Sequence, residues 1–138
     1  MTEKQFGELL ATRLRAGITG DLQIETCRSV LYDLAFGDDG KLRLGLNQKG
    51  EPVRGKGTGF EQDVLIFQRV EGADTSIVPR VCIELKFGRV TTHDAIVYSE
   101  KADRIRRVYP FVRYGLVLGQ HEKIPARVLR LGTEFDFI

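Results

Sequence analysis

Two acidic residues and a lysine lie within apolar stretches of the chain, where a charged side chain is costly to bury. Asp63 precedes one apolar run, and Glu84 and Lys86 lie near the end of another. Burying such charges costs several kcal/mol unless each one is paired or holds an ion. Two carboxylates and the backbone carbonyl of Leu85 form the hard-oxygen shell that Mg²⁺ takes, with water and phosphate filling the rest. The residues therefore predict a Mg²⁺ site, with Mn²⁺ expected to substitute, that polarises a phosphodiester and lowers the pKa of a bound water.

Lys86 follows Glu84 at a spacing of two residues, which places both side chains on one face of a strand. Lys86 would then lie beside the metal-bound water. It could orient that water, deprotonate it, or stabilise charge developing on the phosphate, and the sequence leaves these three roles open. The competing interpretation is that Asp63 ends a strand and that Glu84 and Lys86 form an exposed pair worth under about 1 kcal/mol. Apolar flanks on both strands favour the metal site.

The elements that must position these residues are two neighbouring strands, predicted at 61–70 and 79–87, with a turn over 71–78 between them. Antiparallel pairing of the two strands brings both acids to the same region of the sheet. A helix over about 92–108 is the natural crossover to a buried strand at 114–118. This order predicts that the last strand runs parallel to 79–87 and is joined to it by a right-handed connection.

The rest of the chain is predicted to complete an α/β fold, with a mixed central β-sheet flanked by helices. Thr91 or Thr92 caps the crossover helix. The remaining predictions are an amphipathic helix over 3–15 with Phe6, Leu9, Leu10 and Leu14 inward, a second helix over about 21–35, a short strand over 41–46, a glycine-rich loop over 47–59, a final strand over 126–131, and a tail docked by Phe135 and Phe137.

The charged residues and their flanks resemble the signature of the PD-(D/E)xK nuclease superfamily, which contains the restriction endonucleases and the archaeal-type Holliday junction resolvases. The resemblance rests on Asp63 with the apolar run after it, and on Glu84 and Lys86 with the apolar run before them; it covers roughly residues 25–131. It implies a restriction-endonuclease-like core in which Asp63 and Glu84 are metal ligands and Lys86 is the catalytic lysine. The chain departs from the family pattern at Gln62, which stands where the family name has proline.

The resemblance also implies a further acid on the helix before the motif, in contact with the metal or its water. Glu25 is the preferred residue, because residues 25–31 are similar to the corresponding helix of the larger, translocating restriction enzymes. Glu8 is the alternative, since the stretch around it is similar to the resolvase version. Either acid is equally interpretable as a residue on the flank of a helix.

Superfamily members also place site residues on the helix after the lysine strand. Asp94, Tyr98 and Lys101 share one side of that helix at helical spacing. Tyr98 is interpreted as an edge of the core or as a phosphate contact, and Lys101 as a phosphate contact or a solvated residue.

Composition and charge set the broad class. The 138 residues, 42% hydrophobic and 29% charged, predict one domain over 1–138. No apolar run approaches the length of a membrane span and no secretory signal is recognised, so the cytoplasm is the expected location. Cys27 and Cys82 lie in apolar patterns and are predicted to be buried thiols rather than a disulfide.

The net charge of +2 does not itself indicate nucleic acid, but basic residues cluster between 41 and 57 and between 100 and 113. Such patches fit a phosphate-binding surface, and solvated loops are the alternative. The candidate DNA-binding residues are Lys49, Arg54, Lys56, Lys101 and Arg104.

These features together predict a Mg²⁺-dependent DNA endonuclease of the restriction type. One site cuts one strand, so cleavage of both strands calls for a homodimer or a second pass. A Holliday junction resolvase is the alternative within the same chemistry, favoured by the short chain. A non-catalytic nucleic-acid-binding module on the same fold is the alternative from a different class.

Overall fold

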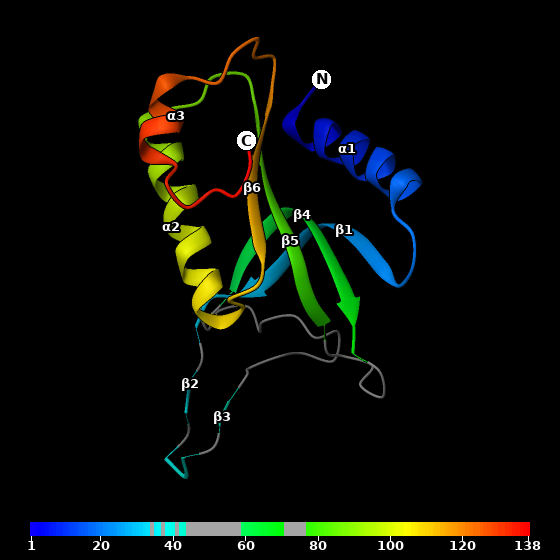
Figure 1. The fold of residues 1–138 in the computed structure, drawn as a ribbon, viewed down its shortest axis with the longest axis vertical. Helices are drawn as coiled ribbons and strands as arrows, with labels where there is room; N and C mark the ends of the chain where they lie inside the picture. The colour runs from blue at the N-terminus through cyan, green and yellow to red at the C-terminus, as the bar shows by residue number, and fades with distance from the viewer. Residues whose placement is uncertain (34, 37, 41, 44–58, 71–76) are drawn as a thin grey trace.

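The structure is a computed structural model, and it describes residues 1–33, 35–36, 38–40, 42–43, 59–70 and 77–138. One helix precedes a run of strands, and two further helices flank the last strand (Figure 1). In chain order they are α1 (Glu3–Gly17), β1 (Leu22–Leu31), β2 (Ala35–Phe36), β3 (Leu42–Arg43), β4 (Gly59–Arg69), β5 (Ile77–Phe87), α2 (Thr92–Val108), β6 (Arg113–Gly119) and α3 (Ala126–Leu131).

Four strands form one mixed sheet in the order β1-β4-β5-β6, and β2 pairs with β3 separately. The β1–β4 and β4–β5 pairs are antiparallel, whereas β5 and β6 are parallel. Figure 1 shows α1 on one side of this sheet and α2 with α3 on the other. The predicted α/β class, the antiparallel pairing of the two acid-bearing strands and the parallel pairing across the crossover helix are confirmed.

Both long helices begin with a capping box, so their starts are encoded locally. In α1, Thr2 and Gln5 exchange side-chain hydrogen bonds with each other's backbone N–H groups. In α2, Thr91 and Asp94 do the same, which makes Thr91 the N-cap. The helix ends at Val108, ahead of Pro110, as predicted.

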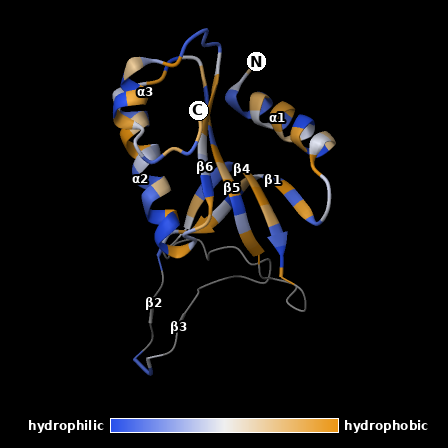
Figure 2. Ribbon diagram, in the orientation of Figure 1, coloured by the Kyte–Doolittle hydropathy of each residue, from blue (hydrophilic) through white to orange (hydrophobic). Residues whose placement is uncertain are grey.

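Two apolar layers lie on the opposite faces of the sheet, because successive side chains of a strand point to opposite sides. Figure 2 shows hydrophobic stretches, in orange, along the central strands, interrupted by hydrophilic residues. The α1-side layer comprises Ala11, Ile24, Val64, Ile66, Ile83 and Leu85. The α2-side layer comprises Val30, Leu65, Phe67, Cys82, Ala102, Ile105, Val112 and Tyr114.

The β1–β4 ribbon changes face midway along its length. Ile24 belongs to the α1-side layer and Val30 to the α2-side layer. They are six positions apart, an even offset that would place both side chains on one face of a regular strand. Cys27 lies between them with φ of 54°, a left-handed conformation that is uncommon for a residue other than glycine. On β4, Val64 packs on the α1 side and Phe60 on the α2 side. Figure 1 shows β1 and β4 bent midway. In the register of these strands, Cys27 and Asp63 lie between the pairs Thr26–Val64 and Arg28–Gln62.

The predicted helix over 21–35 is wrong, since residues 22–31 form the edge strand β1. The apolar residues Val30 and Leu31 fitted a helical stripe with Cys27, but the change of face at Cys27 produces that spacing within a strand. Cys27 is exposed, so its prediction as a buried thiol is wrong, whereas Cys82 is buried and both cysteines are free. The inward placement of Leu9 on α1 is also wrong, because Leu9 is 40% exposed.

The predicted strand over 126–131 is wrong as well, because these residues form the helix α3 after Pro125. The sheet edge at β6 is instead covered by the tail, in which Phe137 forms a parallel bridge with Gly115. A Cβ atom on Gly115 would lie 2.0 Å from the Phe137 ring, so the close approach requires glycine. The predicted docking of Phe135 and Phe137 is confirmed.

Two further predictions fall partly or wholly outside the described residues. The predicted strand over 41–46 is seen only at β3, Leu42–Arg43. The loop over 47–58 lies outside the described residues, as does most of the predicted turn over 71–78; residues 77 and 78 belong to β5.

Asp136 fastens the tail to α2 and β6, and its ionisation should therefore contribute to stability. Its carboxylate accepts hydrogen bonds from Tyr114 N (2.7 Å), Arg106 Nη2 (2.7 Å) and Arg113 Nη1 (2.9 Å). Partial burial opposes ionisation, but these donors outweigh it and lower the pKa of Asp136 below the ordinary aspartate value. A lowered pKa gives stability that is present above the unfolded-state pKa and lost as the pH falls through the folded-state pKa.

Asp136→Asn is therefore expected to lower the free energy of unfolding by about 1–2 kcal/mol at neutral pH. The difference from the wild type should vanish in acid, once Asp136 is protonated in both states. Urea unfolding at pH about 7 and about 2 checks this. An equal loss at both pH values would show that the ionised carboxylate is not what stabilises the tail.

Candidate functional site

Strands β4 and β5 part from each other at the two acids. Their ladder ends with the pair Val64–Ile83. Beyond it, the start of β4 pairs only with β1, and the end of β5 pairs only with β6. We call this opening the fork. Asp63 and Glu84 are the first residues beyond the last pair, so the antiparallel register brings them to the fork from opposite strands.

The Asp63 carboxylate lies against the backbone of β5. Its Oδ2 atom accepts a hydrogen bond from Leu85 N at 2.7 Å. Asp63 and Leu85 also line a cavity of about 190 Å³ that opens toward α1. The other lining residues are Glu3, Lys4, Gly7 and Glu8 of α1 and Thr26 and Cys27 of β1.

Glu84 is the most deeply buried acid of the fork, with 3% exposure. Its Oε1 atom accepts hydrogen bonds from the Tyr114 hydroxyl (2.9 Å) and from Lys101 Nζ on α2. Burial raises the pKa of Glu84, and the nearby charge of Asp63 adds to the rise, although the Lys101 ammonium and the two hydrogen bonds act in the other direction. Burial and the proximity of Glu84 also raise the pKa of Tyr114, so this phenol stays a hydrogen-bond donor.

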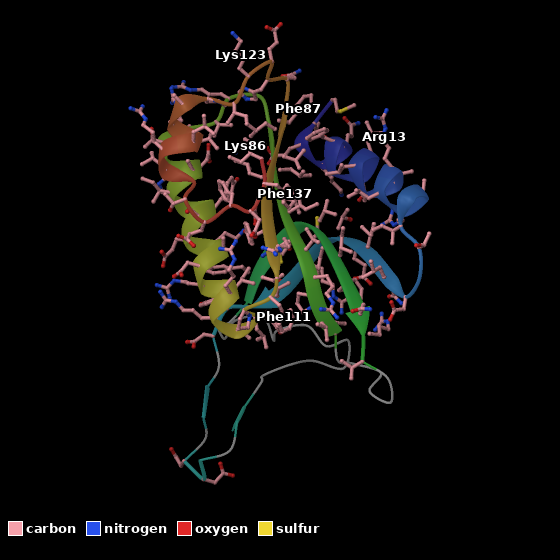
Figure 3. All side chains as sticks on the ribbon, viewed as in Figure 1. Arg13, Lys86, Phe87, Phe111, Lys123 and Phe137 are labelled. Atoms are coloured by element: carbon pink, nitrogen blue, oxygen red, sulfur yellow. The ribbon has the colours of Figure 1, made fainter. Side chains whose placement is uncertain are left out.

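Lys86 lies at the open end of the fork, between the helices on either side (Figure 3). Its Nζ atom is 3.6 Å from Asp94 Oδ1 of α2 and 3.9 Å from Glu3 Oε2 of α1. Glu3 also accepts a hydrogen bond from Phe87 N at 3.1 Å, which ties the first turn of α1 to the end of β5. Partial burial opposes ionisation of Asp94, but the hydrogen bonds from Thr91 and the Lys86 ammonium lower its pKa overall.

The predicted shared side of α2 is confirmed by these contacts. Asp94 meets Lys86, Lys101 meets Glu84, and Tyr98 lies beside Lys101, whose Nζ atom is 5.7 Å from the ring centroid. Burial raises the pKa of Tyr98, with Glu84 the next cause. The helix therefore faces both Glu84 and Lys86 of β5.

Of the two acids proposed to complete the site, Glu8 on α1 lines the cavity and Glu25 does not. Glu25 lies on β1, where its carboxylate pairs with Arg28, so its predicted place on a helix is wrong. The Arg28 guanidinium lies 4.9 Å from the Phe67 ring centroid, on the α2-side layer. Glu8 lines the cavity with Asp63 and accepts a hydrogen bond from Thr26 Oγ1 at 3.0 Å.

Glu3 was not predicted as a site residue from the sequence. Nothing in the spacing of charged and apolar residues along α1 distinguishes it from other exposed acids. Gly7 carried a usable signal for the approach of α1 to the sheet. A Cβ atom there would lie 3.0 Å from Leu85 Cδ1, so glycine lets the helix approach β5 closely without displacing the leucine side chain. Gly7 lies one turn after Glu3 and directly before Glu8, and all three residues line the same cavity.

The candidate DNA-binding residues are only partly described. Lys49, Arg54 and Lys56 lie outside the described residues. Arg104 is on the surface, with its side chain 46% exposed and paired with Glu100. Lys101 is only 15% exposed and is directed into the fork.

The fork offers oxygen ligands but no complete protein shell for a metal. Within the described ranges, no group of three or more histidine, cysteine, aspartate or glutamate side chains is arranged to hold an ion. Asp63 Oδ1 and Glu84 Oε2 have no hydrogen-bond partner in the part of the chain that the structure describes. Two carboxylates and a backbone carbonyl fit a hard divalent cation whose other ligands are water and substrate oxygens.

Comparison with known proteins adds no family assignment to this geometry. A scan against protein-family models finds no match for the chain, and no curated protein matches its sequence. In the described residues, no helix is long and apolar enough to cross a membrane. Any function therefore has to be argued from the fork and the residues around it.

Proposed function

We propose that this chain is a Mg²⁺-dependent DNA endonuclease with the fork as its active site and a restriction-endonuclease-like core of the PD-(D/E)xK kind. The observation that carries the proposal is that Asp63 and Glu84 are the first residues of β4 and β5 beyond the last pair of their ladder, with the Asp63 carboxylate on the Leu85 N–H. The chain order of the acids and of Lys86, two residues after Glu84, supports the same assignment.

Each residue of the fork has a role in this proposal. Asp63 and Glu84 would hold the cation, together with the Leu85 carbonyl. When bound, Mg²⁺ supplies Lewis-acid activation of the phosphodiester and of a water molecule. Tyr114 fixes the orientation of the Glu84 carboxylate through its hydroxyl hydrogen bond.

Lys86 is suited to an electrostatic role. Its ammonium group lies between the carboxylates of Asp94 and Glu3, which hold it at the open end of the fork. A positioned ammonium group stabilises negative charge that develops on a phosphate in the transition state. We therefore infer that Lys86 orients water or stabilises charge, rather than removing the proton from the water.

The proposed substrate is DNA, and a homodimer would place two such sites on the two strands of a duplex. The cytoplasm is the proposed location. The Holliday junction resolvase remains the second candidate, because Glu8, the acid similar to the resolvase version, lines the cavity with Asp63. Cleavage of four-way junctions in preference to linear duplexes of the same sequence would favour the second candidate.

The proposal is tested by incubating supercoiled plasmid with the protein and MgCl₂ and measuring nicked and linear products. Asp63→Asn keeps the size of the side chain but removes its charge, so we expect the cleavage rate to fall by at least about 100-fold. Lys123→Met removes an exposed charge on the loop after β6 and is expected to cleave at the wild-type rate (Figure 3).

Equal rates for the wild type and Asp63→Asn would contradict the assignment of the fork. A wild type that binds DNA but does not cleave it in Mg²⁺ or Mn²⁺ would indicate the non-catalytic binding module instead. Binding should weaken steeply with salt in either case if several phosphates are contacted.

A further inference from the structure

Lys101 occupies a site that is built to hold a cation. Its Nζ atom donates hydrogen bonds to Glu84 Oε1 and to the Glu61 carbonyl, the latter at 3.1 Å. The ring centroids of Phe60 and Tyr98 each lie 5.7 Å from the same nitrogen. A carboxylate, a carbonyl and two aromatic rings therefore surround one ammonium group, and they come from both arms of the fork and from α2.

This ion pair differs from the others on the same helix in its burial. The side chains of Lys101 and Glu84 are 15% and 4% exposed, whereas those of Arg104 and Glu100, one turn along, are 46% and 54% exposed. Water and salt screen a buried pair far less than an exposed one. The Lys101 ammonium is therefore the only positive charge paired with Glu84 among the described residues, and it is little screened.

The carboxylate that Lys101 neutralises is the one that the proposed function assigns to the metal. Carboxylate and carbonyl oxygens are the groups that a divalent cation also requires. Two cations that share one buried carboxylate repel each other strongly, because little solvent separates them. The Tyr114 hydroxyl carries no charge and can keep its hydrogen bond to Glu84 in either state.

We propose that Lys101 is a built-in counter-cation that holds Glu84 in the metal-free protein and leaves it when a divalent cation binds. This proposal rests on the proposed function, because it concerns the same carboxylate. Release of Lys101 is coupled to metal binding and therefore weakens the apparent affinity of the fork for the metal. The released ammonium lies at the opening between the strands, where a phosphate oxygen would replace the lost carboxylate.

Calorimetric titration of the metal-free protein with MnCl₂ tests this coupling directly. Lys101→Met removes the competing charge and keeps an unbranched side chain, so we expect it to bind Mn²⁺ at least about tenfold more tightly than the wild type. Lys123→Met, the same substitution on the exposed loop after β6, is expected to bind as the wild type does. Equal or weaker binding by Lys101→Met would overturn the proposal.

A second measurement uses the wild type and does not depend on whether the variant folds. Reductive methylation followed by peptide mass spectrometry reports how accessible each lysine is, and Lys123 serves as the exposed reference. We expect Lys101 to be protected without metal and to be methylated at least about fivefold faster with saturating Mn²⁺, while Lys123 is unchanged. Lys101 methylation that is unaffected by Mn²⁺ would also overturn the proposal.

The two proposals fail in different ways. Mn²⁺ binding that depends on Asp63 but not on Lys101 would leave the proposed function standing and remove the counter-cation. Release of Lys101 by Mn²⁺ without any DNA cleavage would support the counter-cation proposal and contradict the proposed nuclease function. Absence of Mn²⁺ binding to both the wild type and Lys101→Met would overturn both.

Discussion

Lys86→Met is expected to lower the rate of Mg²⁺-dependent plasmid cleavage by about 100- to 1,000-fold, the effect typical of removing one group that stabilises transition-state charge. The ammonium of Lys86 is held between Asp94 and Glu3 at the open end of the fork, and methionine fills the same space without the charge. The measurement is the initial rate of plasmid nicking under saturating MgCl₂, beside Lys123→Met.

Binding measurements separate this role from metal binding. Among the described residues, no hydrogen bond or ion pair joins Lys86 to Asp63 or Glu84, so Lys86→Met should bind Mn²⁺ at least as well as the wild type. Loss of Mn²⁺ binding together with loss of cleavage would show that Lys86 supports the metal site instead of the reaction. Cleavage at the wild-type rate would exclude Lys86 from the reaction.

Lys101→Met is expected to lower the free energy of unfolding of the metal-free protein by about 3–5 kcal/mol at neutral pH, the usual effect of leaving one charge of a buried pair uncompensated. Glu84 would lose its ammonium partner while keeping only the Tyr114 hydroxyl. Urea unfolding in the presence of a chelator measures the loss. Arg104→Met, which breaks the exposed pair with Glu100, should cost under about 1 kcal/mol.

The double variant Glu84→Gln with Lys101→Met distinguishes the pair from simple packing. It removes both charges and leaves an amide that can still accept the Tyr114 hydrogen bond. We expect it to recover most of the stability lost by Lys101→Met alone, because a neutral pair requires no compensating charge. If the double variant is as unstable as the single one, the loss comes from the lysine side chain's contacts with Phe60 and Tyr98.

The centre of the fold was predictable from the sequence because its signals are local and repeated. The strands that carry Asp63 and Glu84 are apolar along most of their length, and α2 has a capping box and a proline at its two ends. Such signals fix the type and order of elements, and the crossover helix then fixes the parallel pair. The place of Asp63 and Glu84 on neighbouring antiparallel strands follows from that order.

The first strand was not predictable in the same way, because the change of face at Cys27 alters the phase of its hydrophobic pattern. Ile24 points to one layer and Val30 to the other, so no single period describes the segment. A left-handed residue in mid-strand has no signal in a lone sequence when the residue is not glycine.

The contribution of α1 to the site depends on contacts between distant parts of the chain. Glu8 reaches the cavity only because α1 docks over β5 at Gly7, and Glu3 only because it binds Phe87 N. The same holds for Lys101. The sequence does not show whether this helix residue is exposed to solvent or buried against the two strands, as it is in the structure. Local pattern locates helices, whereas docking decides which of their side chains meet.

Phe60 and Val64, at the two ends of the bend in β4, pack in opposite apolar layers. Asp63 lies between them in the chain, so its backbone is held by packed side chains of both layers. Because protein interiors are nearly incompressible, a volume change in either layer is transmitted to the strand that joins them. Substitutions that change the volume of either layer should therefore shift this acid and lower the rate of the proposed reaction, even where they lie far from the metal.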